Sequence, residues 1–208
     1  MCPGGQKFCP FTLSLFGAGW FLIALFIGET ELLSFLPGPA TQITLFGLTA
    51  ALLSLFWISQ SFRNWVNQLQ LKTLISLHLV RFVGVYFLYL HSRGQLPAKF
   101  ALTAGWGDIV VAIGALLLLA IPSARHSTRL VAAWNVIGLL DILLVVATAA
   151  GLAFANRESM SALTRLPLSF LPTMIVPLII SSHIAILVRL TRKRELIERP
   201  TTHTQVLA

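Results

Sequence analysis

The sequence has few charged residues for its length. Only 11% of its 208 residues are Asp, Glu, Lys or Arg, whereas 56% are hydrophobic. A soluble domain carries about a quarter charged residues, and one of this length buries only about 70% of its surface. No polar stretch is long enough to form a separate soluble domain. The composition therefore excludes a soluble globular protein and favours a protein whose solvent is the lipid bilayer.

Cysteine is also scarce. Cys2 and Cys9 are the two cysteines, and both precede the first apolar run. Two thiolates supply half of a tetrahedral zinc site, so we interpret them as free thiols in a short segment. We expect this segment on the cytoplasmic side, where thiols stay reduced.

Motifs of enzymatic chemistry are missing. The chain has no P-loop, no dinucleotide fingerprint, no H-E-x-x-H and no nucleophile elbow, and this favours a protein that is not an enzyme. The net charge of +8 comes without any base-stacking or groove-reading module, which excludes nucleic acid as a partner. The basic residues lie between apolar runs and in a C-terminal cluster, a pattern that predicts contact with anionic lipid head groups.

Six apolar runs of 17–26 residues fill most of the chain. About 20 residues of helix cross a hydrocarbon core of ~30 Å, and no alternation typical of a barrel strand competes. The sequence therefore predicts an all-α fold: one transmembrane domain over 1–191, followed by a basic tail over 192–208 that we expect to be disordered. The predicted helices cover about 11–28, 43–59, 73–91, 100–121, 130–155 and 168–190. A short interfacial helix is predicted between Gln60 and Lys72.

The basic residues between these runs predict the orientation. One side of the membrane collects ten of them: Lys7, Arg63, Lys72, Arg125, Arg129, Arg189, Arg192, Lys193, Arg194 and Arg199. The other side has four: Arg93, Lys99, Arg157 and Arg165. Because the side richer in Lys and Arg faces the cytoplasm, we predict that both termini are cytoplasmic.

Ionisable side chains within the apolar runs are the best indication of a site, because each costs ~2.5–3.5 kcal/mol or more at membrane depth. Counted at ~1.5 Å per residue, Arg81 and Asp108 lie about 15 and 12 Å from the same surface. A buried Arg needs an acidic partner, so we predict an Arg81–Asp108 ion pair. Asp141, near the midplane, is placed to join it. Asn135 is grouped with these three as a candidate substrate or proton-coupling site.

Two histidines form a second layer nearer the cytoplasm. His78 and His183 lie about 9 and 10 Å from that surface. Each can be a structural histidine bonded to a backbone carbonyl. A pair of histidines on facing helices is also a common arrangement for binding haem b or a metal. The sequence leaves both interpretations open.

Two features of the last helices concern packing. Pro172 and Pro177 free the carbonyls four residues earlier, at Leu168 and Thr173, and kinked helices often line a cavity. Ala147 and Gly151 form a small-xxx-small pair, which predicts close approach of another helix.

The segment Gly105-Trp-Gly-Asp108 resembles the G-x-G-D signature of intramembrane aspartyl proteases, which implies a hydrolase with Asp108 and Asp141 as a proton-sharing pair. The chain departs from that family in two ways. Its second acid follows the motif rather than preceding it, and no Pro-Ala-Leu follows. Arg81 at the same depth would also keep Asp108 ionised, which is incompatible with a shared proton.

A broader stretch is similar to uncharacterised bacterial membrane proteins. The residues that carry the resemblance are Arg81-Phe-Val-Gly84, Phe87-Leu88, Gly94-Gln-Leu-Pro97, Phe100-Ala101, Ala104-Gly-Trp-Gly-Asp108, Trp134-Asn135, Gly138, Asp141 and Leu171-Pro172-Thr173. The resemblance implies a bacterial inner membrane protein and carries no activity with it.

Four functional hypotheses follow. The first is a small transporter-like or accessory membrane protein with a buried Arg/Asp cluster and no cofactor. The second is a redox protein that binds haem b through His78 and His183. The third is the aspartyl hydrolase, and the fourth is a structural subunit without a site.

Overall fold

The computed structural model describes residues 10–36 and 39–198, with side chains over 15–36 and 39–192. This part of the chain is helical and contains no strand. Its elements are α1 (Pro10–Glu29), α2 (Leu32–Phe35), α3 (Ala40–Ile58), α4 (Gln60–Gln68), α5 (Leu71–Ser76), η1 (Leu77–Phe82), α6 (Val83–Ser92), α7 (Ala98–Ala120), α8 (Pro122–His126), α9 (Thr128–Ala155), η2 (Arg157–Thr164), η3 (Leu171–Ile175) and α10 (Val176–Glu198).

Five helical segments of the described chain are long and apolar enough to cross a membrane. They are α3, the composite α5–η1–α6, α7, α9, and the composite of η3 with α10. The 20-residue α1 adds a further apolar helix. Large apolar side chains such as Ile137, Leu140 and Leu144 are exposed, as expected for a surface in contact with lipid. The all-α prediction is confirmed, and the protein is a multi-pass membrane protein.

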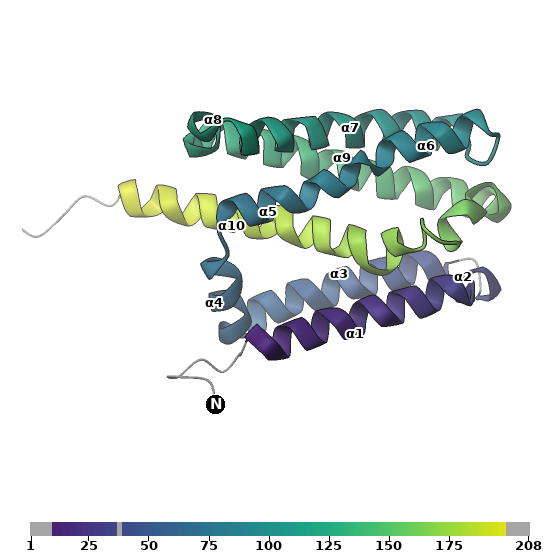
Figure 1. The fold of residues 1–208 in the computed structure, drawn as a ribbon, viewed down its shortest axis with the longest axis horizontal. Helices are drawn as coiled ribbons and strands as arrows, with labels where there is room; N and C mark the ends of the chain where they lie inside the picture. Colours follow the sequence, from purple (N-terminus) through teal and green to yellow (C-terminus); the bar gives the residue numbers. More distant parts are fainter. Residues whose placement is uncertain (1–9, 37–38, 199–208) are drawn as a thin grey trace, which may run out of the picture.

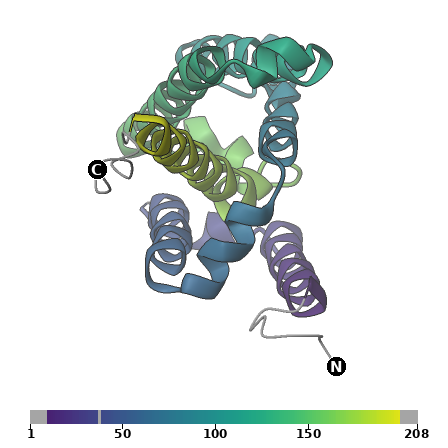
Figure 2. The same cartoon turned by 90° about the vertical axis from the view of Figure 1, so that its left-hand side faces the viewer.

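The helices run roughly along one axis (Figure 1). Helix α10 packs between α3 on one side and α9 on the other. Helix α1 contacts α2 and η3, whereas α6 packs against α7 and α7 against α9 (Figure 2). Helices α4 and α8, the start of α1 and the C-terminal part of α10 gather at one end (Figure 1), here called the basic end. Its basic residues whose side chains are described are Arg63, Lys72, Arg125, Arg129, Arg189 and Arg192. The opposite end has the α6–α7 turn and η2.

The sequence predicted one continuous α-helix for the third transmembrane segment. The structure differs, because the middle of this segment, η1, is a 3₁₀-helix. A 3₁₀-helix has three residues per turn, so residues three apart project in the same direction. His78 and Arg81, both buried in η1, therefore share one direction. A regular α-helix would have placed them on neighbouring faces.

The last transmembrane segment starts later and ends later than the predicted helix over 168–190. It begins with the π-helical turn η3, which contains Pro172, and continues as α10 with Pro177 near its start. Residues 192–198 are helical, which corrects the predicted disorder of this part of the tail. The rest of the predicted tail, 199–208, lies outside the described residues.

The carbonyls that the two prolines free are satisfied in different ways. The Thr173 carbonyl accepts a hydrogen bond from Nε1 of Trp20 on α1, at 2.9 Å. The Leu168 carbonyl accepts the backbone N–H of Leu171, at 2.9 Å. Since an unpaired carbonyl in lipid costs several kcal/mol, the bond from Trp20 helps to hold α1 against the bundle.

The predicted interfacial helix corresponds to α4. Its first turn is capped by Ser59, whose Oγ accepts the Phe62 N–H at 3.3 Å. At its other end Arg189 of α10 donates to the carbonyls of Val66 and Leu69, at 2.6 and 2.7 Å. A cation there satisfies carbonyls that a helix C-terminus leaves unpaired.

Close helix packing occurs at other glycines than the predicted pair. A Cβ on Gly84 of α6 would collide with the Gly105 carbonyl of α7, so only glycine permits this approach. Nothing lies within 4 Å of a Cβ on Gly151, and Ala147 is exposed. The prediction that Ala147 and Gly151 pack against another helix is therefore wrong for the described chain.

Candidate functional site

The first buried polar group joins three helical elements through Arg81. Its Nε lies 2.6 Å from Oδ1 of Asp108 on α7, its Nη1 donates to the Gly138 carbonyl of α9 at 2.9 Å, and its Nη2 pairs with Oδ2 of Asp141 on α9. The predicted Arg81–Asp108 pair is confirmed, and Asp141 joins it as expected. We call Arg81, Asp108 and Asp141 the ion cluster.

The ion cluster is well shielded and unbalanced in charge. The side chains of Arg81, Asp108 and Asp141 are 2%, 5% and 16% exposed. Two carboxylates face one guanidinium, and no other described cation forms an ion pair with them. With both aspartates ionised the cluster has a net charge of −1. An uncompensated charge is costly away from water, so uptake of one proton neutralises the cluster.

Glycine makes space for this geometry. A Cβ on Gly107 of α7 would collide with the Asp141 carboxylate, so the absence of a side chain there lets α9 bring Asp141 to Arg81. Gly138 supplies its carbonyl to Arg81, and a Cβ on it would lie 2.6 Å from Cε1 of His183. Gly138 thus lies between the ion cluster and the histidines.

The histidines form the second buried polar group, with ring centroids 4.2 Å apart. Asn135 holds His183 at two points: its Nδ2 donates to the His183 carbonyl at 3.0 Å, and its Oδ1 lies 2.9 Å from Nδ1. Nδ1 of His183 must therefore carry the proton. Nε2 of His78 lies 3.1 Å from Oγ of Ser182. Asn135 belongs to this group and not to the ion cluster with which the sequence grouped it.

The described residues leave one nitrogen of each ring, Nδ1 of His78 and Nε2 of His183, without a hydrogen-bond partner. Axial ligation of haem places the iron and the porphyrin plane between two imidazoles, each about 2 Å from the metal. Rings with centroids 4.2 Å apart leave no space for that plane. No group of three or more metal-binding side chains occurs among the described residues. The geometry at His78 and His183 does not fit the haem b hypothesis.

The geometry of the ion cluster also disfavours a hydrolase. An aspartyl dyad needs two carboxyl groups that share a proton and hold a water. Here each carboxylate is bound by a different nitrogen of Arg81, so a guanidinium bridges the two carboxyl groups in place of the water that the dyad would hold.

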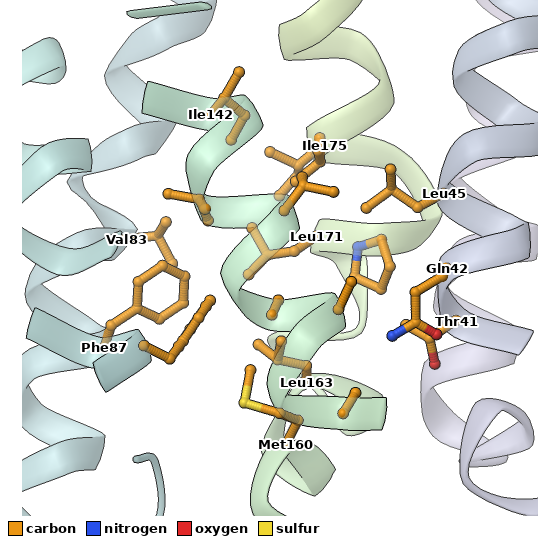
Figure 3. Close-up of a pocket in the computed structure, with 18 of the residues that line it drawn as sticks. Thr41, Gln42, Leu45, Val83, Phe87, Ile142, Met160, Leu163, Leu171 and Ile175 are labelled. Atoms are coloured by element: carbon orange, nitrogen blue, oxygen red, sulfur yellow. The ribbon is translucent and has the colours of Figure 1, made fainter. Parts of the chain in front are cut away.

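A mostly apolar cavity extends from the ion cluster towards the opposite end of the bundle. Figure 3 shows Val83 and Phe87 on one side and Leu45 on the other, with Leu171 and Ile175 between them. The cavity follows α9 from Ile142 to Ala153 and reaches η2. Its charged or polar lining residues are Arg81 and Asp108 of the ion cluster, and Thr41, Gln42, Arg157 and Thr164 at the opposite end.

Sequence reasoning missed several of these residues. Ser182 and the Gly138 carbonyl are partners that only the packing of α9 and α10 supplies, and no sequence signal marks them. Arg157 was counted only as a loop charge. Its Nη2 donates to the carbonyls of Leu33, Ser34 and Leu36, and the residue lines the cavity.

Comparison with known families identifies the chain. Residues 39–191 match the model of a domain of unknown function, DUF8737, so the chain belongs to this family. None of the curated proteins and none of the solved structures that were compared with it matches. The match runs from the start of α3 to residue 191 within α10 and therefore covers both buried polar groups and all the residues that line the cavity.

Proposed function

We propose that this member of the DUF8737 family is a small transporter-like membrane protein whose ion cluster exchanges a proton when the adjoining cavity is occupied. The observation that carries the proposal is the engagement of one buried guanidinium by two carboxylates, at a place where Asp108 and Arg81 also line the cavity. A ligand that disturbs either ion pair of Arg81 weakens the stabilisation of that ionised carboxylate and hence raises its affinity for a proton. Buried ionisable residues of this kind are typical of ion and proton pathways.

The second candidate is an accessory protein in which the ion cluster only locks helices together. The same hydrogen bonds tie η1 to α7 and α9, which favours this alternative as well. The two candidates differ in whether a proton is bound, and that difference can be measured.

The proposed location is a bacterial inner membrane with both termini in the cytoplasm. The bacterial assignment depends on the sequence resemblance. The orientation depends on the excess of Lys and Arg at the basic end, which supports placing that end on the cytoplasmic side.

Binding of a proton by the ion cluster is tested by infrared difference spectroscopy of the purified protein in lipid nanodiscs during a pH titration. We expect a carbonyl band from one protonated carboxylic acid, shifted in D₂O. The band should disappear in Asp108→Asn and also in Asp141→Asn, because either change leaves one carboxylate opposite one guanidinium. Glu31→Gln is the matched control, since Glu31 pairs with Arg165 outside the cluster, and it should leave the band unchanged.

Two results would contradict the proposal. One is the lack of a protonated-acid band in the wild-type protein at any pH at which it stays folded. The other is a band that persists in both Asn variants, which would assign the proton to another group and leave the accessory role.

A further inference from the structure

We propose that the cavity binds one long-chain aliphatic amphiphile with an anionic head, its chain directed towards the ion cluster and its head at Arg157. This inference rests on the proposed function, because it names the ligand class of the same cavity. Four observations carry it: the lining of the cavity, its length, its width and its charge.

The lining selects an apolar ligand body. Between the two polar ends the cavity wall is made of aliphatic and aromatic side chains, among them Phe87, Phe100, Val145, Met160 and Ile179. Such a wall offers no hydrogen-bond partner to a sugar, a nucleotide or an amino acid, and a polar ligand would lose its hydration there without compensation. An alkyl chain instead gains free energy when its apolar surface leaves water for this wall.

The length of the cavity matches one leaflet. The α9 residues that line it run from Ile142 to Ala153, a rise of about 16 Å at 1.5 Å per residue. Half of a hydrocarbon core of ~30 Å is about 15 Å. A chain of the length that fills one leaflet therefore fits between the ion cluster and the level of Arg157.

The width admits a single chain. The space open to the centre of a water molecule is about 100 Å³. Spread over a length of about 16 Å, this is a narrow channel that one alkyl chain can follow and that two chains side by side cannot. A single-chain amphiphile fits this shape better than a two-chain phospholipid.

The charge at the mouth selects the head group. Arg157 is exposed, and it is the one charged lining residue away from the ion cluster. No carboxylate among the described residues forms an ion pair with it, and its described hydrogen bonds, all to carbonyls, leave from Nη2. A guanidinium with uncompensated charge is complementary to a carboxylate or a phosphate.

The test is photo-crosslinking of a diazirine-bearing palmitate analogue to the protein in phosphatidylcholine nanodiscs, with the labelled residues mapped by mass spectrometry. We expect labelling of α9 and η2 that is prevented when excess palmitate competes for the cavity before irradiation; this part is called the removable labelling. Ala149→Phe fills the cavity and should lower the removable labelling by about tenfold. Ala147→Phe is the matched control: it adds the same ring two positions away on the exposed face of α9 and should leave the labelling unchanged.

The mouth is tested with Arg157→Gln and Arg157→Lys. The Gln variant should lower the removable labelling about tenfold, and the Lys variant, which keeps the charge, should retain most of it. Should Ala149→Phe fail to fold, Ala153→Leu narrows the cavity near its mouth and serves the same purpose.

Three outcomes would overturn the inference. Labelling that is equal in Ala149→Phe and Ala147→Phe would show partition into the surrounding lipid only. Labelling that excess phosphatidylglycerol removes as well as palmitate does would assign the cavity to a two-chain lipid. Labelling that is unchanged in Arg157→Gln would refute the binding of the anionic head by Arg157. Selective labelling of a protein that shows no protonated-acid band would support amphiphile binding and contradict only the proposed proton exchange. The failure of one proposal can therefore be told apart from the failure of the other.

Discussion

At the scale of single residues, Arg81 is the connection on which the buried site depends. Its three described contacts go to two helices, and two of the three are charged. An arginine suits this role because its planar guanidinium presents several donors in fixed directions. A lysine has a single donor nitrogen and could not reach Asp108, Asp141 and the Gly138 carbonyl at once.

The charge balance predicts strongly non-additive effects of two substitutions. Asp108→Asn or Asp141→Asn alone leaves a carboxylate opposite Arg81, so each should lower the free energy of unfolding by about 1 kcal/mol or less. The double variant leaves a buried guanidinium without a counter-charge, which should cost about 3–5 kcal/mol. Denaturant unfolding of the detergent-purified variants measures all three. Additive effects of the two single changes would show that the carboxylates act independently.

A charge swap is not expected to restore the site. Arg81→Asp combined with Asp108→Arg re-creates one ion pair, but it places an aspartate at position 81, opposite Asp141 and the Gly138 carbonyl. Both of these acceptors lose their donor. The contacts with Asp141 and the Gly138 carbonyl therefore require the arginine at position 81 and the aspartate at position 108, and not the reverse.

At the scale of the elements, two irregular helical segments contribute to the site. The 3₁₀-helix η1 aligns His78 with Arg81, and the π-helical η3 carries Leu171 and Pro172 into the cavity wall. Irregular backbone is tolerated at membrane depth only where it is buried in protein or lines a cavity, and π-helical turns are frequent at functional sites. The helix breaks and the candidate site thus coincide.

The close approach of α6 and α7 predicts the cost of a single methyl group. Gly84→Ala would force a Cβ against the Gly105 carbonyl and to 3.0 Å from Cβ of Asp108, so it should push α6 away from α7. Overpacking of this kind costs about 1–3 kcal/mol. Gly151→Ala is the matched control, since nothing lies within 4 Å of its Cβ and alanine favours a helix. Thermal unfolding of both variants checks this, and equal stability would refute the close approach.

At the scale of the whole molecule, the basic end and the opposite end predict how the protein sits in the membrane. In a background with Cys2→Ser and Cys9→Ser, we introduce Ser123→Cys at the basic end and Gln95→Cys at the opposite end; both positions are exposed. A membrane-impermeant maleimide added to right-side-out vesicles should label Cys at 95 and should reach Cys at 123 only after the vesicles are opened.

The reverse labelling pattern would place the basic end outside the cell and would contradict the proposed orientation. It would also place the mouth of the cavity at Arg157 on the cytoplasmic side, and so change the leaflet from which an amphiphile enters.

The sequence by itself determined the fold class, the approximate limits of the helices and one ion pair. These properties follow from local quantities: hydropathy sets the helix lengths, and the cost of a buried charge requires a partner at equal depth, as for Arg81 and Asp108. Pro177 likewise indicated a freed carbonyl at Thr173, although nothing in the sequence pointed to Trp20 as its donor.

Only the tertiary structure decided how these pieces combine. It put Asn135 beside His183 rather than in the ion cluster, made η1 a 3₁₀-helix, continued α10 beyond the predicted boundary and formed a cavity that reaches Arg157. The placement of Asn135 and the shape of the cavity depend on contacts between residues far apart in the chain, as the ion cluster does through Arg81 and Asp141. The cluster also depends on the space that Gly107 leaves for a neighbouring helix. Spacing along one helix contains no information about which neighbour will fill that space.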